Sequence, residues 1–166
     1  ARDAAGNTAT ASVTVTANNV AAGLVAAWGF AEGAGTTAAD SSGHSLNGTI
    51  SNATWSTAGK FGDALSFNGT NSWVTVADNA LLDLTEAMTL EAWVYPTAPG
   101  ITPTTVVMKE RGSNGFSYAL YGADGAGQPP AGYIRRGSSN VSAVGTSALP
   151  LNTWTHLAAT YDGATL

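Results

Sequence analysis

Residues 88–95 read Met-Thr-Leu-Glu-Ala-Trp-Val-Tyr and alternate between apolar and mixed positions. Met88, Leu90, Ala92 and Val94 fall on one side of this stretch, and Thr89, Glu91, Trp93 and Tyr95 fall on the other. Side chains of a β-strand point to opposite faces with a period of two residues. The stretch therefore predicts a strand with one face in a core and one face that carries aromatic rings beside a carboxylate.

Short apolar runs of the same kind recur on both sides of this stretch. They cover 24–30, 64–67, 73–76, 104–109, 116–121 and 154–161. Asn-Gly or Asp-Gly pairs, which predict tight turns, begin at Asn47, Asn68, Asn114, Asp124 and Asp162. Residues 79–88 predict a short connecting helix or turn, and Pro96, Pro99 and Pro103 predict a long loop. Short strands between regular turns predict an all-β fold, an antiparallel two-sheet sandwich.

The composition limits the classes of partner. The chain has 166 residues, about one domain, of which 44% are hydrophobic and 10% are charged. Eleven Asp and Glu against six Lys and Arg leave a net charge of −5, which repels phosphate backbones, so nucleic acid is not expected as a partner. The chain has no Cys, which excludes disulfides and thiolate metal sites. No stretch approaches the roughly 20 apolar residues of a membrane span.

The first residues differ from the rest of the chain. Val13 and Val15 alternate with polar residues and predict one strand, but the segment that follows has the small, polar composition of a linker. The string DAAGNTATASVTVT from Asp3 resembles the last hairpin of bacterial immunoglobulin-like repeats. We therefore interpret 1–18 as the terminal strand of an immunoglobulin-like domain, 19–22 as a linker and 23–166 as the main domain.

Four ordered blocks in the main domain resemble one known family. They are GLVAAWGFAEGAGTTAADSSGHSLNGTI from Gly23, KFGDALSFNGTNSWVTV from Lys60, MTLEAWVYP from Met88 and LPLNTWTHLAATYDGATL from Leu149. In this order they resemble the bacterial laminin-G-like jelly rolls of the concanavalin A-like lectin and glucanase fold. The resemblance implies a jelly-roll sandwich that belongs to a larger secreted or cell-surface protein. It also implies further strands after Gly163, so we expect a C-terminally incomplete sandwich whose remaining strands come from the parent chain or a partner.

A polar segment after residue 39 is a candidate metal loop. Asp40, Ser42 and Asn47 offer a carboxylate, a hydroxyl and an amide, the hard oxygen ligands that calcium prefers. Relatives with a similar Asp-x-Ser-Gly segment often bind calcium there, so the resemblance implies Ca²⁺ as a cofactor. The alternative is a turn in which these side chains bond to their own backbone.

The aromatic residues allow two interpretations. Trp73, Trp93, Tyr95, Trp154 and Tyr161 could stack on sugar rings, or they could fill a sandwich core. We expect a core position for Trp28, Trp93 and Trp154. Tyr118, Tyr121 and Tyr133 lie nearer to Gly-rich loops, where exposure is expected, and Arg135 could bind a carboxylate. These last four residues are the predicted ligand-binding residues.

A catalytic site is not predicted. Glucanases of this fold need two carboxylates on one strand face, about 5 Å apart for retaining chemistry. The sequence offers Glu91, whose neighbours on the same face are Thr89 and Trp93, and His156 has no Ser or Cys elbow beside it. The sequence thus predicts a non-catalytic, lectin-like module whose partner is a glycan. The alternatives are an adhesion module that binds a cell-surface protein and, with less support, a glycoside hydrolase.

Overall fold

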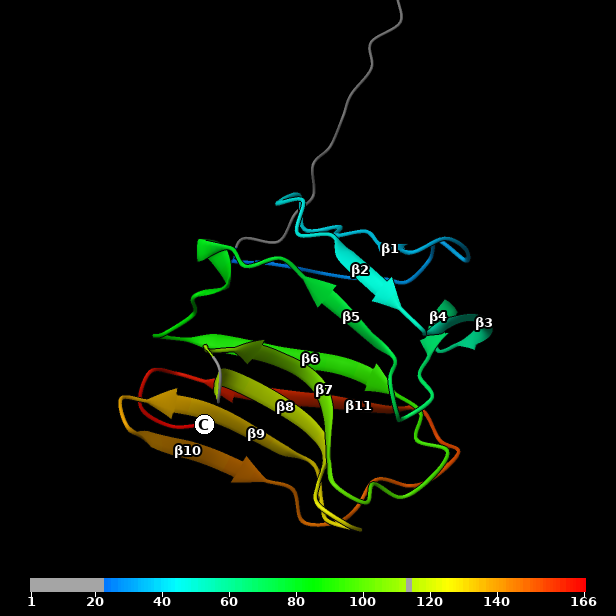
Figure 1. Cartoon of the computed structure of the whole chain (residues 1–166). Helices are drawn as coiled ribbons and strands as arrows, with labels where there is room; N and C mark the ends of the chain where they lie inside the picture. The colour runs from blue at the N-terminus through cyan, green and yellow to red at the C-terminus, as the bar shows by residue number, and fades with distance from the viewer. Residues whose placement is uncertain (1–22, 113–114) are drawn as a thin grey trace, which may run out of the picture.

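The computed structural model describes residues 23–112 and 115–166 (Figure 1). The predicted immunoglobulin-like strand in 1–18 and the predicted linker in 19–22 lie outside these residues. Within the described ranges, no helix has the length and the apolar character needed to cross a membrane.

Regular structure in the described residues consists of β-strands and one short 3-10 helix. The elements are β1 (Thr37–Ala38), β2 (Gly48–Ser51), β3 (Thr54–Gly59), β4 (Gly62–Ser66), β5 (Trp73–Val76), η1 (Ala80–Leu82), β6 (Met88–Val94), β7 (Pro103–Glu110), β8 (Phe116–Asp124), β9 (Ala131–Arg136), β10 (Ser139–Val144) and β11 (Thr155–Tyr161). This confirms the predicted all-β fold and the short helix within 79–88.

The strands form antiparallel sheets. One sheet has the order β10-β9-β8-β7, in which each strand pairs with the next along the chain. β6 pairs with β11, β2 lies between β1 and β5, and β3 forms a hairpin with β4. In Figure 1, β1, β2 and β5 lie above the layers that contain β6 to β11. Within the described residues, β5 pairs only with β2, and β6 pairs only with β11. The expectation that further strands complete the sandwich stays a prediction.

The core lies between the β6–β11 pair and the four-stranded sheet. Its buried residues are Met88 and Leu90 from β6, Tyr118 and Leu120 from β8, Ile134 from β9, and Leu157 and Tyr161 from β11. The two layers approach closely at Gly132 of β9, where a Cβ atom would lie 2.6 Å from the Cβ of Ala159 in β11. Two antiparallel layers therefore pack face to face, as a jelly-roll sandwich requires.

The prediction of a strand over 24–30 was wrong, because these residues form one isolated β-bridge instead of a strand. Only Trp28 forms a bridge, to Asp40, and the chain leaves the extended conformation at Phe30, whose φ is 53°. The loop predicted through Pro103 ends earlier, because Pro103 opens β7. β7 lies at the edge of its sheet, and the first residue of an edge strand is a position that tolerates proline.

The predicted turns are confirmed in part. Gly69, Gly125 and Gly163 have positive φ, as the turns after Asn68, Asp124 and Asp162 require. Gly48 instead lies inside β2, where a Cβ would come within 2.4 Å of Val74. This glycine is needed for close packing rather than for a turn. Asn114 lies outside the described residues.

Candidate functional site

Three of the four predicted ligand-binding residues lie on the outer face of the four-stranded sheet. Tyr118 and Leu120 of β8 point into the core. Ala119 lies between them and Tyr121 follows them, so the side chains of Ala119 and Tyr121 point outward. Tyr133 of β9 pairs with Ala119 and shares this face. The rings of Tyr121 and Tyr133 lie 5.7 Å apart, with an interplanar angle of 72°. We call the outward surface formed by Tyr121, Tyr133, Arg135, Ala119 and Ala131 the tyrosine face.

Small residues separate the large ones on the tyrosine face. Ala119 pairs with Tyr133, and Ala131 pairs with Tyr121. The exposed fractions of these alanines are 0% and 3%, although both point away from the core. Met108 of β7 pairs with Ala119 from the other side and is 38% exposed. The alanines thus form a floor that is covered by the longer side chains around it.

Polar groups at the tyrosine face are held in fixed positions. The Tyr133 hydroxyl donates a hydrogen bond of 2.7 Å to Oδ2 of Asp124. This bond, together with burial and the negative charge of Asp124, raises the pKa of Tyr133 to about 12. Arg135 lies two residues along β9 from Tyr133, on the same face, and is exposed. Its Nε donates to the carbonyl of Gly137 at 3.1 Å and its Nη1 to Oδ1 of Asn140 at 3.3 Å.

The fourth predicted ligand-binding residue, Tyr118, is not at the surface. Its side chain is part of the core and is 4% exposed, and its hydroxyl donates to the carbonyl of Leu82 at 3.0 Å. Burial raises the pKa of Tyr118. The expected exposure of Tyr118 was wrong. Successive residues of a strand point to opposite faces, and the position of Tyr118 in β8 places its side chain on the core face.

The candidate metal loop is organised by the carboxylate of Asp40. Its Oδ1 accepts hydrogen bonds from the backbone N–H of Ala27 and of Ser42, each at 2.9 Å. Its Oδ2 accepts from the Ser42 hydroxyl at 2.7 Å and from the N–H of Leu46 at 2.9 Å. Burial acts to raise the pKa of Asp40, but these hydrogen bonds outweigh burial and lower that pKa to about 2. Asn47 completes the loop, because its Oδ1 accepts from the N–H of Asp40 at 2.9 Å.

This donor set does not fit a calcium ion. Calcium takes six to eight oxygen ligands, whereas each oxygen of Asp40 already accepts two N–H or O–H groups. The Ser42 hydroxyl donates to Asp40, and its oxygen lies 3.0 Å from the carbonyl oxygen of Val25. In the described part of the chain, no group of three His, Cys, Asp or Glu residues is placed to hold a metal. The hydrogen bonds are those of the turn that was the alternative interpretation, and a calcium titration of the melting temperature tests the metal that the sequence predicted.

A second aromatic surface lies on the outer face of β6 and β11. Trp93 and His156 pair across the strands with their rings 5.2 Å apart, and the rings of Tyr95 and Trp154 lie 5.5 Å apart. We call these four residues the tryptophan face. Trp93 is 41% exposed, so its expected core position was wrong, whereas its place on the outer face of the strand is confirmed.

The other aromatic residues lie elsewhere. Trp28 and Trp154 are half-buried and lie outside the core cluster, so their expected core positions were wrong, whereas Tyr161 is fully buried in the core. Trp73 is 52% exposed on β5. The five aromatic residues considered as one platform therefore do not form a single surface.

Carboxylates do not pair on the outer face of β6. Glu91 lies opposite Ala158 of β11, and its Oε2 is 3.5 Å from Nε2 of His156. Its neighbours on the strand face are Thr89 and Trp93. At the register positions around Glu91 there is thus no partner for the acid and nucleophile pair of a glycosidase.

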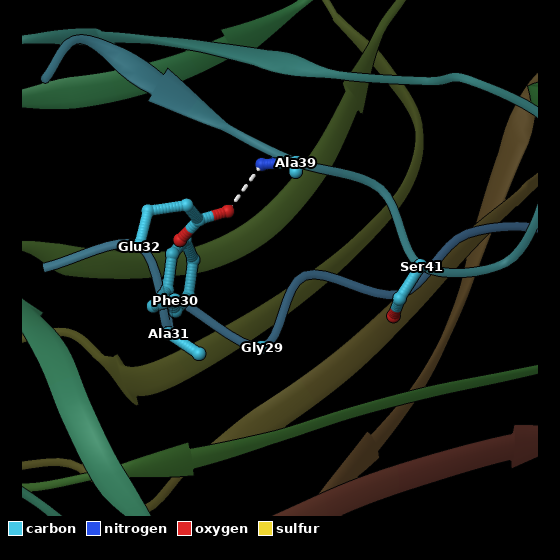
Figure 2. A pocket seen from close by; sticks show the side chains of 6 residues that line it. All are labelled: Gly29, Phe30, Ala31, Glu32, Ala39 and Ser41. Carbon is cyan, nitrogen blue, oxygen red and sulfur yellow. Dashed lines mark hydrogen bonds between the residues drawn. The ribbon is translucent and has the colours of Figure 1, made fainter.

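A shallow hollow lies at the N-terminal segment of the main domain. Figure 2 shows its lining residues, which are Gly29, Phe30, Ala31, Glu32, Ala39 and Ser41. The carboxylate of Glu32 accepts a hydrogen bond from the N–H of Ala39 at 2.6 Å (Figure 2). One carboxylate oxygen of Glu32 and the Ser41 hydroxyl, which donates to the carbonyl of Ala27 at 3.0 Å, are thus already bonded to the backbone.

Comparison with known proteins places the chain in a family. No curated protein and no solved structure was found to match it. The Laminin_G_3 family model, described as concanavalin A-like lectin/glucanases superfamily, matches residues 68–166, which include β5 to β11 and both aromatic faces. The matched residues make up more than half of the chain, and its all-β sandwich agrees with the fold of that family. The chain therefore belongs to the concanavalin A-like lectin/glucanases superfamily.

Proposed function

We propose that this chain is a non-catalytic carbohydrate-binding module and that the tyrosine face receives the glycan. The observation that carries the proposal is the contact of Tyr121 with Tyr133, whose rings lie 5.7 Å apart beside buried alanines. The apolar face of a sugar ring packs on aromatic rings, and a few fixed polar groups orient a ligand on such a surface. Asp124 and Arg135 supply an acceptor and a donor for sugar hydroxyls at this face.

The non-catalytic part of the proposal is supported by the surroundings of Glu91. Its Oε2 lies 3.5 Å from Nε2 of His156, and its opposite position on β11 is Ala158. Family membership alone does not decide between lectins and glycosidases, because one fold hosts many activities. The decision rests on the carboxylates, which would have to come in pairs.

A glycan array tests the proposal when it is probed with the chain and with two variants. Tyr121→Ala/Tyr133→Ala removes both rings of the tyrosine face, whereas Trp73→Ala removes an exposed ring from the β1-β2-β5 sheet and serves as the control. We expect the double variant to bind at least about tenfold more weakly, because each buried aromatic contact contributes on the order of 1 kcal/mol or more. We expect the control to bind as the unchanged chain does.

The opposite results would reject the proposal. If the double variant binds the same glycans with the same affinity, the tyrosine face is not the site. If the unchanged chain binds no glycan, the adhesion alternative replaces carbohydrate binding.

A further inference from the structure

We propose that the tryptophan face, together with Lys60 and Phe61, is a second binding surface that takes acidic sugars. In this arrangement the sugar ring packs on Phe61 and on the exposed part of Trp93, and the sugar carboxylate pairs with the ammonium group of Lys60. This inference does not rest on the tyrosine face, which lies on the other sheet.

The stacking surface is built by two segments that are distant in sequence. The ring of Trp93 in β6 contacts His156 of β11 at 5.2 Å and Phe61, at the tip of the β3–β4 hairpin, at 5.6 Å and 87°. Figure 1 shows this hairpin beside the end of β6. Trp93 remains 41% exposed and Phe61 remains 79% exposed. Aromatic rings that contact one another and still face solvent indicate an interaction surface rather than an isolated exposed residue.

The cation at this surface has no acidic partner in the described part of the chain. Lys60 Nζ lies 4.7 Å from the ring centroid of Trp93 and 5.8 Å from that of Phe61. The other lysine of the described residues, Lys109, contacts the carboxylates of Asp78 and Asp83. An ammonium group held over an aromatic face by a cation–π contact keeps its hydrogen-bond donors available for an anion.

The hairpin tip is fixed by glycines. A Cβ on Gly59 would lie 2.4 Å from the carbonyl oxygen of Gly62, so the chain closes there more tightly than a larger residue allows. Gly62 has a φ of 108°, which other residues rarely adopt. The turn thereby places Lys60 and Phe61 beside Trp93.

Charge selects the acidic class of sugar. Packing on Phe61 and Trp93 alone admits many neutral sugars, because any apolar ring face can pack there. A carboxylate on the sugar adds a charge-assisted contact with Lys60, and such contacts are stronger than neutral ones. The negative charge on this face belongs to Glu91, which lies 3.5 Å from the imidazole of His156 and not in contact with Lys60.

Calorimetric titration with oligogalacturonate and with its methyl ester tests the inference. The two probes share their sugar rings and differ in charge. We expect the acid to bind at least about fivefold more tightly than the ester. Lys60→Gln should lower the affinity for the acid by about three- to tenfold and leave the ester unaffected, and Lys60→Arg should retain the preference. Trp93→Ala should lower the affinity for both probes by about tenfold.

Controls on the other sheet separate this inference from the proposed function. Tyr121→Ala/Tyr133→Ala should leave the preference for the acid over the ester, and the dependence of that preference on Lys60, unchanged, and circular dichroism should show that each variant keeps its fold. The inference is wrong if acid and ester bind equally, if Lys60→Gln has no effect, or if neither probe binds. Loss of binding in the tyrosine variant alone would assign the ligand to the tyrosine face and would also reject the second surface.

Discussion

The hydroxyl of Tyr133 donates a hydrogen bond of 2.7 Å to Oδ2 of Asp124 and thereby fixes the aromatic ring at the centre of the tyrosine face. This bond raises the pKa of Tyr133 from its ordinary value of 10.0 to about 12. The folded state thus favours the protonated phenol. The contribution of this group to stability is complete below pH 10 and is lost as the pH rises from 10 towards 12.

A loss of stability in alkali is the first prediction. The free energy of unfolding should fall between about pH 10 and pH 12. In the Tyr133→Phe variant it should fall less steeply, because residue 133 then has no phenol to ionise. Burial also raises the pKa of Tyr118 and Tyr121, so the variant should keep part of the effect. Urea denaturation at a series of pH values measures it. Identical pH profiles for the two proteins would contradict the assigned bond.

The Asp40 loop gives the second prediction, on acid stability. The hydrogen bonds that lower the pKa of Asp40 from 3.8 to about 2 stabilise the fold above pH 3.8, and this contribution disappears as the pH falls towards 2. Asp40→Asn should cost about 1–3 kcal/mol at neutral pH, because one side of an amide donates where both carboxylate oxygens accept. Glu86→Gln, at an exposed position, is the control. Thermal or denaturant melts compare the three proteins, and equal stability of Asp40→Asn and the unchanged chain would contradict the role assigned to the carboxylate.

Metal removal gives the third prediction. Because N–H and O–H donors occupy both oxygens of Asp40, the melting temperature should be the same in excess calcium and in excess chelator. Differential scanning calorimetry measures both conditions. A melting temperature that rises with calcium concentration would restore the calcium site predicted from the sequence.

The fourth prediction concerns Tyr118, whose hydroxyl bonds to the carbonyl of Leu82 inside the protein. Tyr118→Phe should destabilise the fold by about 1 kcal/mol, because a partly buried carbonyl loses its donor. It should leave the affinity for glycans unchanged, in contrast to changes at Tyr121 and Tyr133. A stable Tyr118→Phe variant that no longer binds glycan would return this residue to the binding site.

The packing of the two layers gives the fifth prediction. Gly132→Ala would place a Cβ atom 2.6 Å from the Cβ of Ala159 and should cost about 1–3 kcal/mol through overpacking. Gly29→Ala, where a Cβ meets no atom within 4 Å, is the matched control. Equal melting curves for the two variants would show that the layers are further apart than described.

The sequence predicted those features that depend on local patterns. The alternation in 88–95 correctly assigned both faces of β6, and turns at Gly69 and Gly163 followed from the dipeptides that precede them. β9 and β10 were missed because Gly and Ser interrupt their apolar pattern. Trp93 was assigned to the core from the burial tendency of tryptophan, although the alternation of its own strand placed it outside.

The candidate sites were harder to predict, because they depend on contacts between distant segments. Tyr121 and Tyr133 were identified as candidates, but their contact depends on the register of β8 and β9. Lys60 and Phe61 reach Trp93 from a hairpin that is more than 30 residues away, and no local pattern signals that approach. The sequence correctly placed Asp40 in a polar loop. The hydrogen bonds of its carboxylate could be assigned only from the positions of the surrounding N–H groups in the structure.

Chemical-shift mapping of the chain by NMR, with an oligosaccharide selected on the array, tests the central claim most directly. The account predicts that the largest shifts on titration occur at the amides of Ala119, Tyr121 and Tyr133 and in the rings of the two tyrosines. Shifts that leave these residues unchanged while the oligosaccharide binds, or the absence of shifts with every oligosaccharide offered, would contradict it.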